Sequence, residues 1–165
     1  MSTMLAVKRS FALLFALLLS ACGENINQQL FEQYYEPFAV QLNPDAAVHH
    51  PELDTAYLAY QNADYATVER ITTKFLEEYY SVPQVMFAQS IAFVELDKDE
   101  EAINNFRTLA MHPFLGPQAE WYLSLVYVRN GRAEEAKPLL EKLGRSYEPE
   151  KEKALALLKD LAEIG

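Results

Sequence analysis

The side chains that could do chemistry in this chain are few and far apart. Its three histidines are His49, His50 and His112, and its single cysteine is Cys22. Adjacent histidines in a loop cannot face one metal ion as a pair four residues apart on a helix can, and no carboxylate cluster stands at ligand spacing beside them. The sequence has no G-x-S-x-G elbow, and its five glycines form no phosphate-binding loop. We therefore expect no catalytic residue, no metal site and no cofactor.

The surroundings of Cys22 indicate one specific chemistry. The chain opens with the cationic pair Lys8-Arg9 and an apolar run from Phe11 to Leu19, which is the layout of a secretory signal and is short for a membrane span. The residues Leu19-Ser20-Ala21-Cys22 resemble the bacterial lipobox, in which the cysteine becomes the lipidated first residue of the mature protein. The alternative is an ordinary cleavable signal followed by a chance cysteine.

The lipobox resemblance implies that residues 1–21 are removed and that lipid on Cys22 holds the protein at a membrane. Several acyl chains bury enough methylene groups for lasting attachment. In lipoproteins of bacteria with two membranes, an Asp directly after the cysteine tends to retain the product at the inner membrane. Gly23 stands there instead, which implies the outer membrane, with the domain facing the periplasm. Such processing would leave no free thiol for a disulfide.

The charge balance limits the class of partner. The chain has 24 acidic and 14 basic side chains, and removal of Lys8 and Arg9 would take its net charge from −10 to about −12. A surface of this kind repels phosphate backbones and anionic headgroups. We therefore expect no nucleic acid partner and no electrostatic docking on membranes, whereas basic partners are permitted.

Three positions 34 residues apart, Val68, Ala102 and Ala136, lie in similar sequence surroundings. The segments FAQSIAFVELDKDEEAINNF (87–106) and WYLSLVYVRNGRAEEAKPLL (121–140) align over their whole length in this register. A period of this length indicates stacked helical hairpins, because one hairpin cannot bury its apolar face alone. We predict that the small residues of the register lie where helices cross closely. In the first helices these are Ala56, Ser90 and Ser124.

The period and the small residues resemble the tetratricopeptide repeat, whose pattern is W-x2-L-G-x2-Y, then A-x3-F, then P. The matching positions are Leu123-Ser124-x2-Tyr127 and Ala136-x3-Leu140 in the third copy, Gln89-Ser90-x2-Phe93 and Ala102-x3-Phe106 in the second, and the degenerate Thr55-Ala56-x2-Ala59 and Val68-x3-Thr72 in the first. Trp121 stands one place after the family's Trp, no copy has its Gly, and its closing Pro is absent or shifted to Pro113. The alternative is an unrelated helical bundle.

The resemblance implies an all-α fold, a right-handed solenoid of about three tetratricopeptide repeats with an N-terminal helix and a C-terminal cap helix. The expected organisation is a signal peptide over 1–21, a lipidated tether with a short helix and loop over 22–51, and a repeat domain over 52–165, with repeats near 50–82, 83–116 and 117–148 and a cap helix over 149–164. Apolar periodicity and Pro/Gly punctuation predict helices near 28–36, 52–62, 65–79, 84–96, 99–111, 117–129 and 133–145.

In the repeat register, the first helix of each hairpin presents one face to a concave groove. The nine residues on this face are Leu53, Tyr57, Tyr60, Phe87, Ile91, Val94, Trp121, Leu125 and Val128. None is basic or an amide, and the nearest cation is Arg129, so the clamp for a C-terminal carboxylate used by chaperone-binding members of the family is not expected here. A large apolar surface marks an interaction site. Three interpretations remain: a partner helix in the groove, the chain's own Leu30-Phe31-Tyr34-Tyr35 segment folded onto the repeats, or ordinary inter-repeat core.

These features predict a non-catalytic protein–protein interaction scaffold. It would be a lipid-anchored protein of the bacterial envelope that helps to assemble or position an envelope complex, as is implied by similarity to outer-membrane lipoproteins of such repeats that serve barrel insertion or pilus secretin assembly. The alternative is a regulatory partner of a membrane-anchored signalling protein. In both cases we expect a protein or helical peptide in the groove, and contact with the membrane through the lipid.

Overall fold

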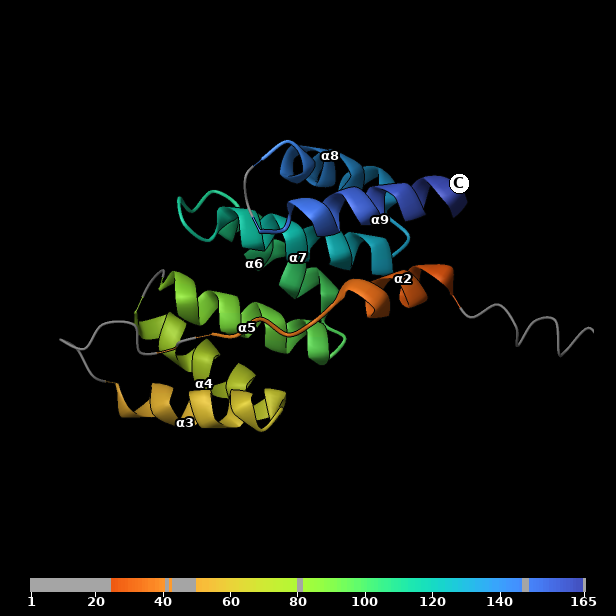
Figure 1. Ribbon diagram of the computed structural model, residues 1–165. Helices are drawn as coiled ribbons and strands as arrows, with labels where there is room; N and C mark the ends of the chain where they lie inside the picture. The colour runs from red at the N-terminus through yellow and green to blue at the C-terminus, as the bar shows by residue number, and fades with distance from the viewer. Residues whose placement is uncertain (1–24, 41, 43–49, 80–81, 147–148, 165) are drawn as a thin grey trace, which may run out of the picture.

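The computed structural model describes residues 25–40, 42, 50–79, 82–146 and 149–164, and these residues form helices and loops without any strand (Figure 1). The helices are α2 (Ile26–Tyr34), α3 (Pro51–Gln61), α4 (Tyr65–Glu78), α5 (Pro83–Glu95), α6 (Asp99–Leu109), α7 (Gly116–Arg129), α8 (Ala133–Gly144) and α9 (Lys151–Ile164). The predicted all-α fold is confirmed over this part of the chain.

Helix boundaries follow local chemistry. Pro51 and Pro83 each occupy the first helical position, where the missing N–H would have no helical partner in any case. The Asp64 side chain caps α4 by accepting a hydrogen bond of 3.2 Å from the backbone N of Thr67. The predicted start of the last helix at Pro149 was two residues early, because residues 149 and 150 form a turn before α9 begins.

The backbone of the hairpin turns repeats with the period of the sequence. Ala63, Asp97 and Gly131 occupy equivalent places between the helices of a hairpin, and their φ angles are 56°, 55° and 70°. The residue after each turn donates its backbone N–H to a carbonyl five residues earlier, over 2.9 Å from Asp64 to Ala59, 2.8 Å from Lys98 to Phe93 and 2.8 Å from Arg132 to Tyr127. The 34-residue register therefore describes backbone geometry as well as residue type.

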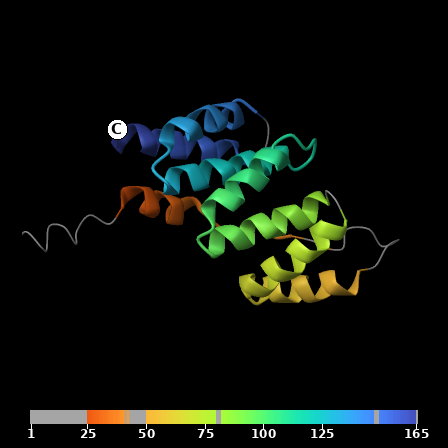
Figure 2. The same cartoon turned by 180° about the vertical axis from the view of Figure 1, so that it is seen from behind.

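The three hairpins α3–α4, α5–α6 and α7–α8 follow one another in space as they do in sequence, and each helix packs against the next (Figures 1 and 2). The small and branched residues of the 34-residue register are all buried, which is consistent with the predicted close helix crossings. They are Ala56, Ser90, Ser124, Val68, Ala102 and Ala136. Side chains of this size let two helix backbones approach closely while larger neighbours fill the space beside them.

Ion pairs connect successive hairpins at their turns. Lys98 Nζ lies 2.6 Å from Glu69 Oε1, and Arg132 Nη1 lies 3.0 Å from Glu100 Oε1. Arg129 forms a further pair with Asp99. The acidic residues at the start of α6 lie where negative charge offsets the helix dipole, and Asp99 and Glu100 additionally bind the hairpin that follows.

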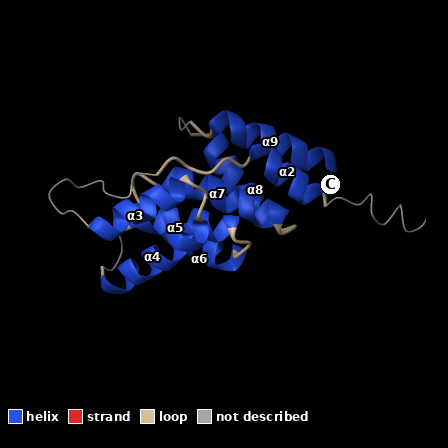
Figure 3. Cartoon of the chain, turned by 90° about the horizontal axis from the view of Figure 1, so that it is seen from below, coloured by secondary structure: helices blue, strands red, loops and turns tan. Residues whose placement is uncertain are grey.

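The N-terminal segment, which we define as residues 26–40, returns onto the stacked hairpins. α2 packs against α7 and α9, and the extended residues after it run across α7 and α5 towards α3 (Figure 3). Pro37 accounts for the change of conformation, since a residue that precedes proline is disfavoured in helical geometry. No helix among the described residues has both the length and the apolar character needed to cross a membrane.

Candidate functional site

Eight of the nine residues predicted to line an open groove are buried. Tyr57 is the exception, with 36% of its surface exposed. The eight buried residues are Leu53, Tyr60, Phe87, Ile91, Val94, Trp121, Leu125 and Val128. The expectation of an open apolar groove therefore needs correction at these positions, because the side chains are packed inside the protein.

The covering element is the N-terminal segment. Leu30 and Phe31 on α2 are buried. The Tyr34 ring meets Trp121 edge to face, with 6.3 Å between ring centroids, and the Phe38 ring lies 4.8 Å from that of Phe87. Of the three interpretations of the apolar face, these contacts support the chain's own segment folded onto the hairpins.

Two tyrosine hydroxyls bind the backbone of this segment on either side of Pro37. Tyr122 Oη donates to the carbonyl oxygen of Glu36 over 2.6 Å, and Tyr60 Oη donates to that of Phe38 over 2.6 Å. Because both acceptors are main-chain atoms, these bonds fix the path of the segment without depending on its side chains. This is the manner in which a groove holds an extended peptide.

Two further phenol hydroxyls of the segment itself bind carboxylates on the hairpin stack and the last helix. Tyr35 Oη donates to Glu95 Oε1 over 2.8 Å, and Tyr34 Oη donates to Asp160 Oδ2 over 2.7 Å. Bonds to a charged acceptor are stronger than neutral ones. Tyr34 and Tyr35 thus connect the N-terminal segment to α9 and α5 by polar contacts, in addition to apolar packing.

These surroundings hold the tyrosines in their neutral form. Burial, followed by the hydrogen bond to Asp160, raises the pKa of Tyr34 from 10.0 to about 12. Burial and the Glu95 carboxylate raise the pKa of Tyr35 still further, and burial raises the pKa of Tyr60 and Tyr122 well above the ordinary value. All four hydroxyls therefore remain hydrogen-bond donors over the whole physiological pH range.

Arg129, the cation nearest the predicted groove, is occupied by contacts within the protein. Its guanidinium lies 4.4 Å from the centroid of the Phe31 ring, and Nη2 donates to the carbonyl oxygen of Val94 over 3.1 Å. Its Nε donates to Asp99 Oδ2 over 3.0 Å. A guanidinium engaged on these three sides is not placed to clamp a partner's carboxylate.

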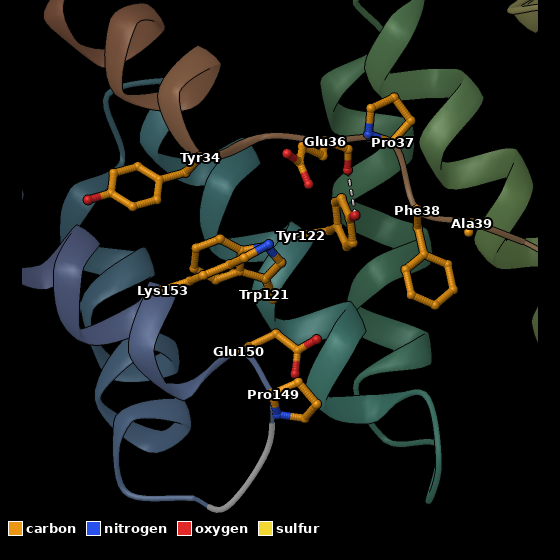
Figure 4. A pocket seen from close by; sticks show the side chains of 10 residues that line it. All are labelled: Tyr34, Glu36, Pro37, Phe38, Ala39, Trp121, Tyr122, Pro149, Glu150 and Lys153. Carbon is orange, nitrogen blue, oxygen red and sulfur yellow. Dashed lines mark hydrogen bonds between the residues drawn. The ribbon is translucent and has the colours of Figure 1, made fainter.

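A pocket of about 370 Å³ lies where the N-terminal segment, α7 and the start of α9 meet (Figure 4). Its lining combines aromatic rings with charged side chains. The residues are Tyr34, Glu36, Pro37, Phe38, Ala39, Trp121, Tyr122, Pro149, Glu150 and Lys153. Glu150 Oε2 is buried and has no hydrogen-bond partner among the described residues.

Sequence reasoning found Trp121 but missed Phe38, Tyr122 and Glu150. One signal was present: Phe38, Val40 and Leu42 are apolar at alternate positions, which is typical of an extended segment with one buried face. Val40 and Leu42 are indeed buried, and Ala39 between them and Phe38 is exposed. Tyr122 and Glu150 carry no comparable pattern, because their contacts depend on the path of a distant segment.

A second feature is the α6–α7 tip, which we define as residues 110–115. Met111 and Phe114 are each 82% exposed there. His112 Nδ1 accepts hydrogen bonds from the backbone N of Phe114 (3.3 Å) and of Leu115 (3.2 Å). The chain is tightly folded at Gly116, where an added Cβ would lie 2.8 Å from the carbonyl oxygen of Ala110. The tip is therefore an ordered turn that presents two bulky apolar side chains to solvent.

Over the described residues, no group of three or more His, Cys, Asp or Glu side chains is placed to hold a metal ion. His50 Nδ1 lies 3.5 Å from Glu52 Oε1, and its ring packs against Phe75 and Tyr79. His49 and Cys22 lie outside the described residues.

No family model, curated protein or solved structure matches this chain. The tetratricopeptide and lipoprotein resemblances therefore stay predictions from the sequence.

Proposed function

We propose that this chain is a non-catalytic protein–protein interaction scaffold, tethered to the bacterial envelope by lipid on Cys22, whose helical hairpins position another protein. In this proposal the hairpins are tetratricopeptide-like repeats and the domain faces the periplasm from the outer membrane. Support comes from the 34-residue period, which recurs both in the sequence and in the turns at Ala63, Asp97 and Gly131.

The observation that carries the scaffold function is the exposed apolar pair on the α6–α7 tip. Met111 and Phe114 are 82% exposed, whereas the other large apolar side chains on the described surface lie between 36% and 57%. Phe and Met are enriched in the cores of protein interfaces. An ordered turn also lowers the conformational entropy that binding would otherwise cost. The tip thus has the composition and the rigidity of a protein-binding element.

Its place in the molecule favours a protein partner over the membrane that would hold the anchor. The tip and the start of α2 lie at opposite ends of the molecule in Figures 1 and 2. Three residues lie between Cys22 and Ile26, so the four steps from one Cα to the next span roughly 14 Å at most. A lipid on Cys22 would therefore hold the start of α2 close to the bilayer and leave the tip pointing away from it.

A photo-crosslinking residue in place of Phe114 tests the scaffold function in living cells. We expect one discrete adduct with another envelope protein, identified by mass spectrometry after detergent solubilisation. The matched control is the same residue in place of Leu155, which is also exposed but lies on α9. Met111→Ser with Phe114→Ser should abolish co-purification of the adduct's partner. Identical adducts from both positions, or none from Phe114, would contradict the proposal.

The Cys22→Ser variant tests the tether separately. Because the lipobox resemblance provides the only anchor in the proposal, the variant should move from the membrane pellet to the soluble periplasmic fraction. Cell fractionation with an immunoblot measures the shift, and Ser20→Ala serves as a control that keeps a small residue at the cleavage site. A Cys22→Ser protein that still sediments with outer membranes after a salt wash would show that lipid is not the anchor.

A further inference from the structure

The pocket beside the N-terminal segment has aromatic walls and acidic ends. Trp121 and Tyr122 form the wall contributed by α7, and Tyr34 and Phe38 come from the segment that covers it (Figure 4). In that view the Glu36 and Glu150 side chains lie on opposite sides of the α7 rings. Its volume of about 370 Å³ is within the range of pockets that hold small organic groups.

Glu150 supplies the observation that points to a ligand. Its Oε2 is buried and has no hydrogen-bond partner in the part of the chain that the structure describes, although a carboxylate oxygen can accept more than one hydrogen bond. A buried acceptor in this state costs free energy, and a charged one costs more than a neutral one. A group that donates hydrogen bonds and carries positive charge would remove this cost.

The electrostatics of the pocket agree with a positively charged occupant. Both the Glu150 and the Glu36 carboxylates act on the Tyr122 hydroxyl and, after burial, contribute to the raised pKa of that residue. Aromatic ring faces attract cations as well, and do so most strongly in partly desolvated sites. Lys153 is the single cation among the lining residues, against two carboxylates.

From this geometry we infer that the pocket binds an organic cation, an ammonium or guanidinium group on a short apolar stem, with Glu150 as its hydrogen-bond acceptor and the Trp121 and Tyr122 rings beside the stem. The inference does not depend on the proposed scaffold function, since the pocket shares no lining residue with the α6–α7 tip. The group could belong to a free amine or to an Arg or Lys side chain of a basic protein, which this acidic chain would attract.

Lys153 allows the charge preference of the pocket to be tested independently of Glu150. Its side chain lines the same pocket, and its positive charge would repel a bound cation. Removing this charge with Lys153→Gln should therefore strengthen binding of a cation. A pocket built for an anion would respond in the opposite direction.

Titration of the full-length protein in detergent tests the inference, with butylguanidinium as the probe and emission of Trp121, the only tryptophan, as the readout. We expect saturable binding, weakened about tenfold or more in Glu150→Gln because a charged hydrogen-bond acceptor is lost. Glu152→Gln, which removes the same charge from an exposed position two residues later in the first turn of α9, should bind as the wild type does. 1-Pentanol, a neutral molecule of similar size, should not compete.

The source of the cation is decided by a second arm with the capped tripeptide acetyl-Ala-Arg-Ala-amide. Tighter binding of the peptide than of butylguanidinium indicates a protein side chain, and equal binding indicates a free amine; both results support the site. Absence of saturable binding, competition by 1-pentanol, or weaker binding to Lys153→Gln would each overturn it. If Glu150→Gln does not fold, the binding of butylguanidinium to Lys153→Gln and the competition with 1-pentanol decide whether the pocket is a cation site.

Discussion

At the residue scale, four tyrosine hydroxyls hold the N-terminal segment on the rest of the protein by hydrogen bonds. Tyr34, Tyr35, Tyr60 and Tyr122 each donate a hydrogen bond between the segment and the hairpins or α9. A phenol can donate only while it is protonated, and two of these donors face carboxylates that would repel a phenolate. Deprotonation would therefore remove the bond and, at Tyr34 and Tyr35, replace it with repulsion.

This chemistry predicts alkaline release of the segment. The pKa of Tyr34 in the folded protein, about 12, lies above the ordinary value of 10.0, so the stability that this residue contributes is fully present below pH 10 and is lost as the pH rises through about 12. Trp121 emission should shift to the red in that window. Tyr34→Phe should lose part of the transition, and Tyr57→Phe, at an exposed tyrosine, should not change it. A shift complete below pH 10 would contradict the assignment.

At the residue scale, the sequence predicts part of the candidate site. The repeat register placed Tyr60, Phe87 and Trp121 on one face of the first helices, and in the structure each of them contacts the N-terminal segment. It could not select Tyr122, whose acceptor is a main-chain carbonyl 86 residues away at Glu36. Bonds to backbone atoms place no demand on the partner's side chain, so they leave no pattern in the sequence.

At the element scale, the three hairpin turns share one backbone conformation, although a different residue type adopts it in each turn. Ala63, Asp97 and Gly131 all have positive φ, a region that costs a residue with a Cβ about 1–2 kcal/mol. Gly131 meets the demand without that cost. A glycine directly after a helix is a sequence signal for such a turn, whereas Ala63 gives no such signal. Only the 34-residue register relates the two.

Exchanging the residues of these turns should change stability in opposite directions. Ala63→Gly should stabilise the protein by about 0.5–1 kcal/mol, since relief of the strained φ exceeds the added entropy of the unfolded chain. Gly131→Ala should destabilise it by about 1–2 kcal/mol, because the backbone φ of 70° is unfavourable for any residue with a Cβ. The added Cβ would also lie 3.3 Å from Asn27 Nδ2. Urea unfolding measures both. A lower midpoint for Ala63→Gly would mean that the turn is not strained.

The close helix crossings make a separate prediction. Ala136 is fully buried on α8, where it lies in register with Ala102 and Val68. Ala136→Leu should overpack this crossing and cost about 1–3 kcal/mol. Ala66→Leu adds the same volume on the exposed face of α4 and should leave the stability within about 0.5 kcal/mol of the wild type. Equal melting temperatures for the two variants would count against the register.

Elements are the scale at which the sequence is most informative. Apolar period and prolines located every hairpin helix to within about two residues, because those signals act within one turn of the backbone. The extended run after α2 was not predicted as an ordered element. Its order comes from the rings and hydroxyls of α3, α5 and α7, which are contributed by residues far along the chain.

At the scale of the whole molecule, the N-terminal segment changes how the stack should unfold. Hairpins that contact only their neighbours unfold piecemeal, in the manner of repeat arrays. Here α2 contacts both α7 and α9, and Tyr60 on α3 binds the far end of the same segment. The segment therefore connects the first hairpin to the third and to the last helix. We expect it to make unfolding of these parts cooperative.

Deleting residues 23–38 tests this role directly, because it removes α2 and Phe38 while keeping Cys22. Trp121 is buried beneath Tyr34, so its emission should shift to the red, and an apolar dye should bind the uncovered faces of α5 and α7. Unfolding in urea should broaden into separate steps for the first and third hairpins. The double variant Tyr60→Phe with Tyr122→Phe keeps every ring and removes only two hydroxyls, so it should lose about 1 kcal/mol per bond without exposing Trp121. Unchanged emission and a single sharp transition after the deletion would show that the buried face is inter-hairpin core and that the segment is not what connects its parts.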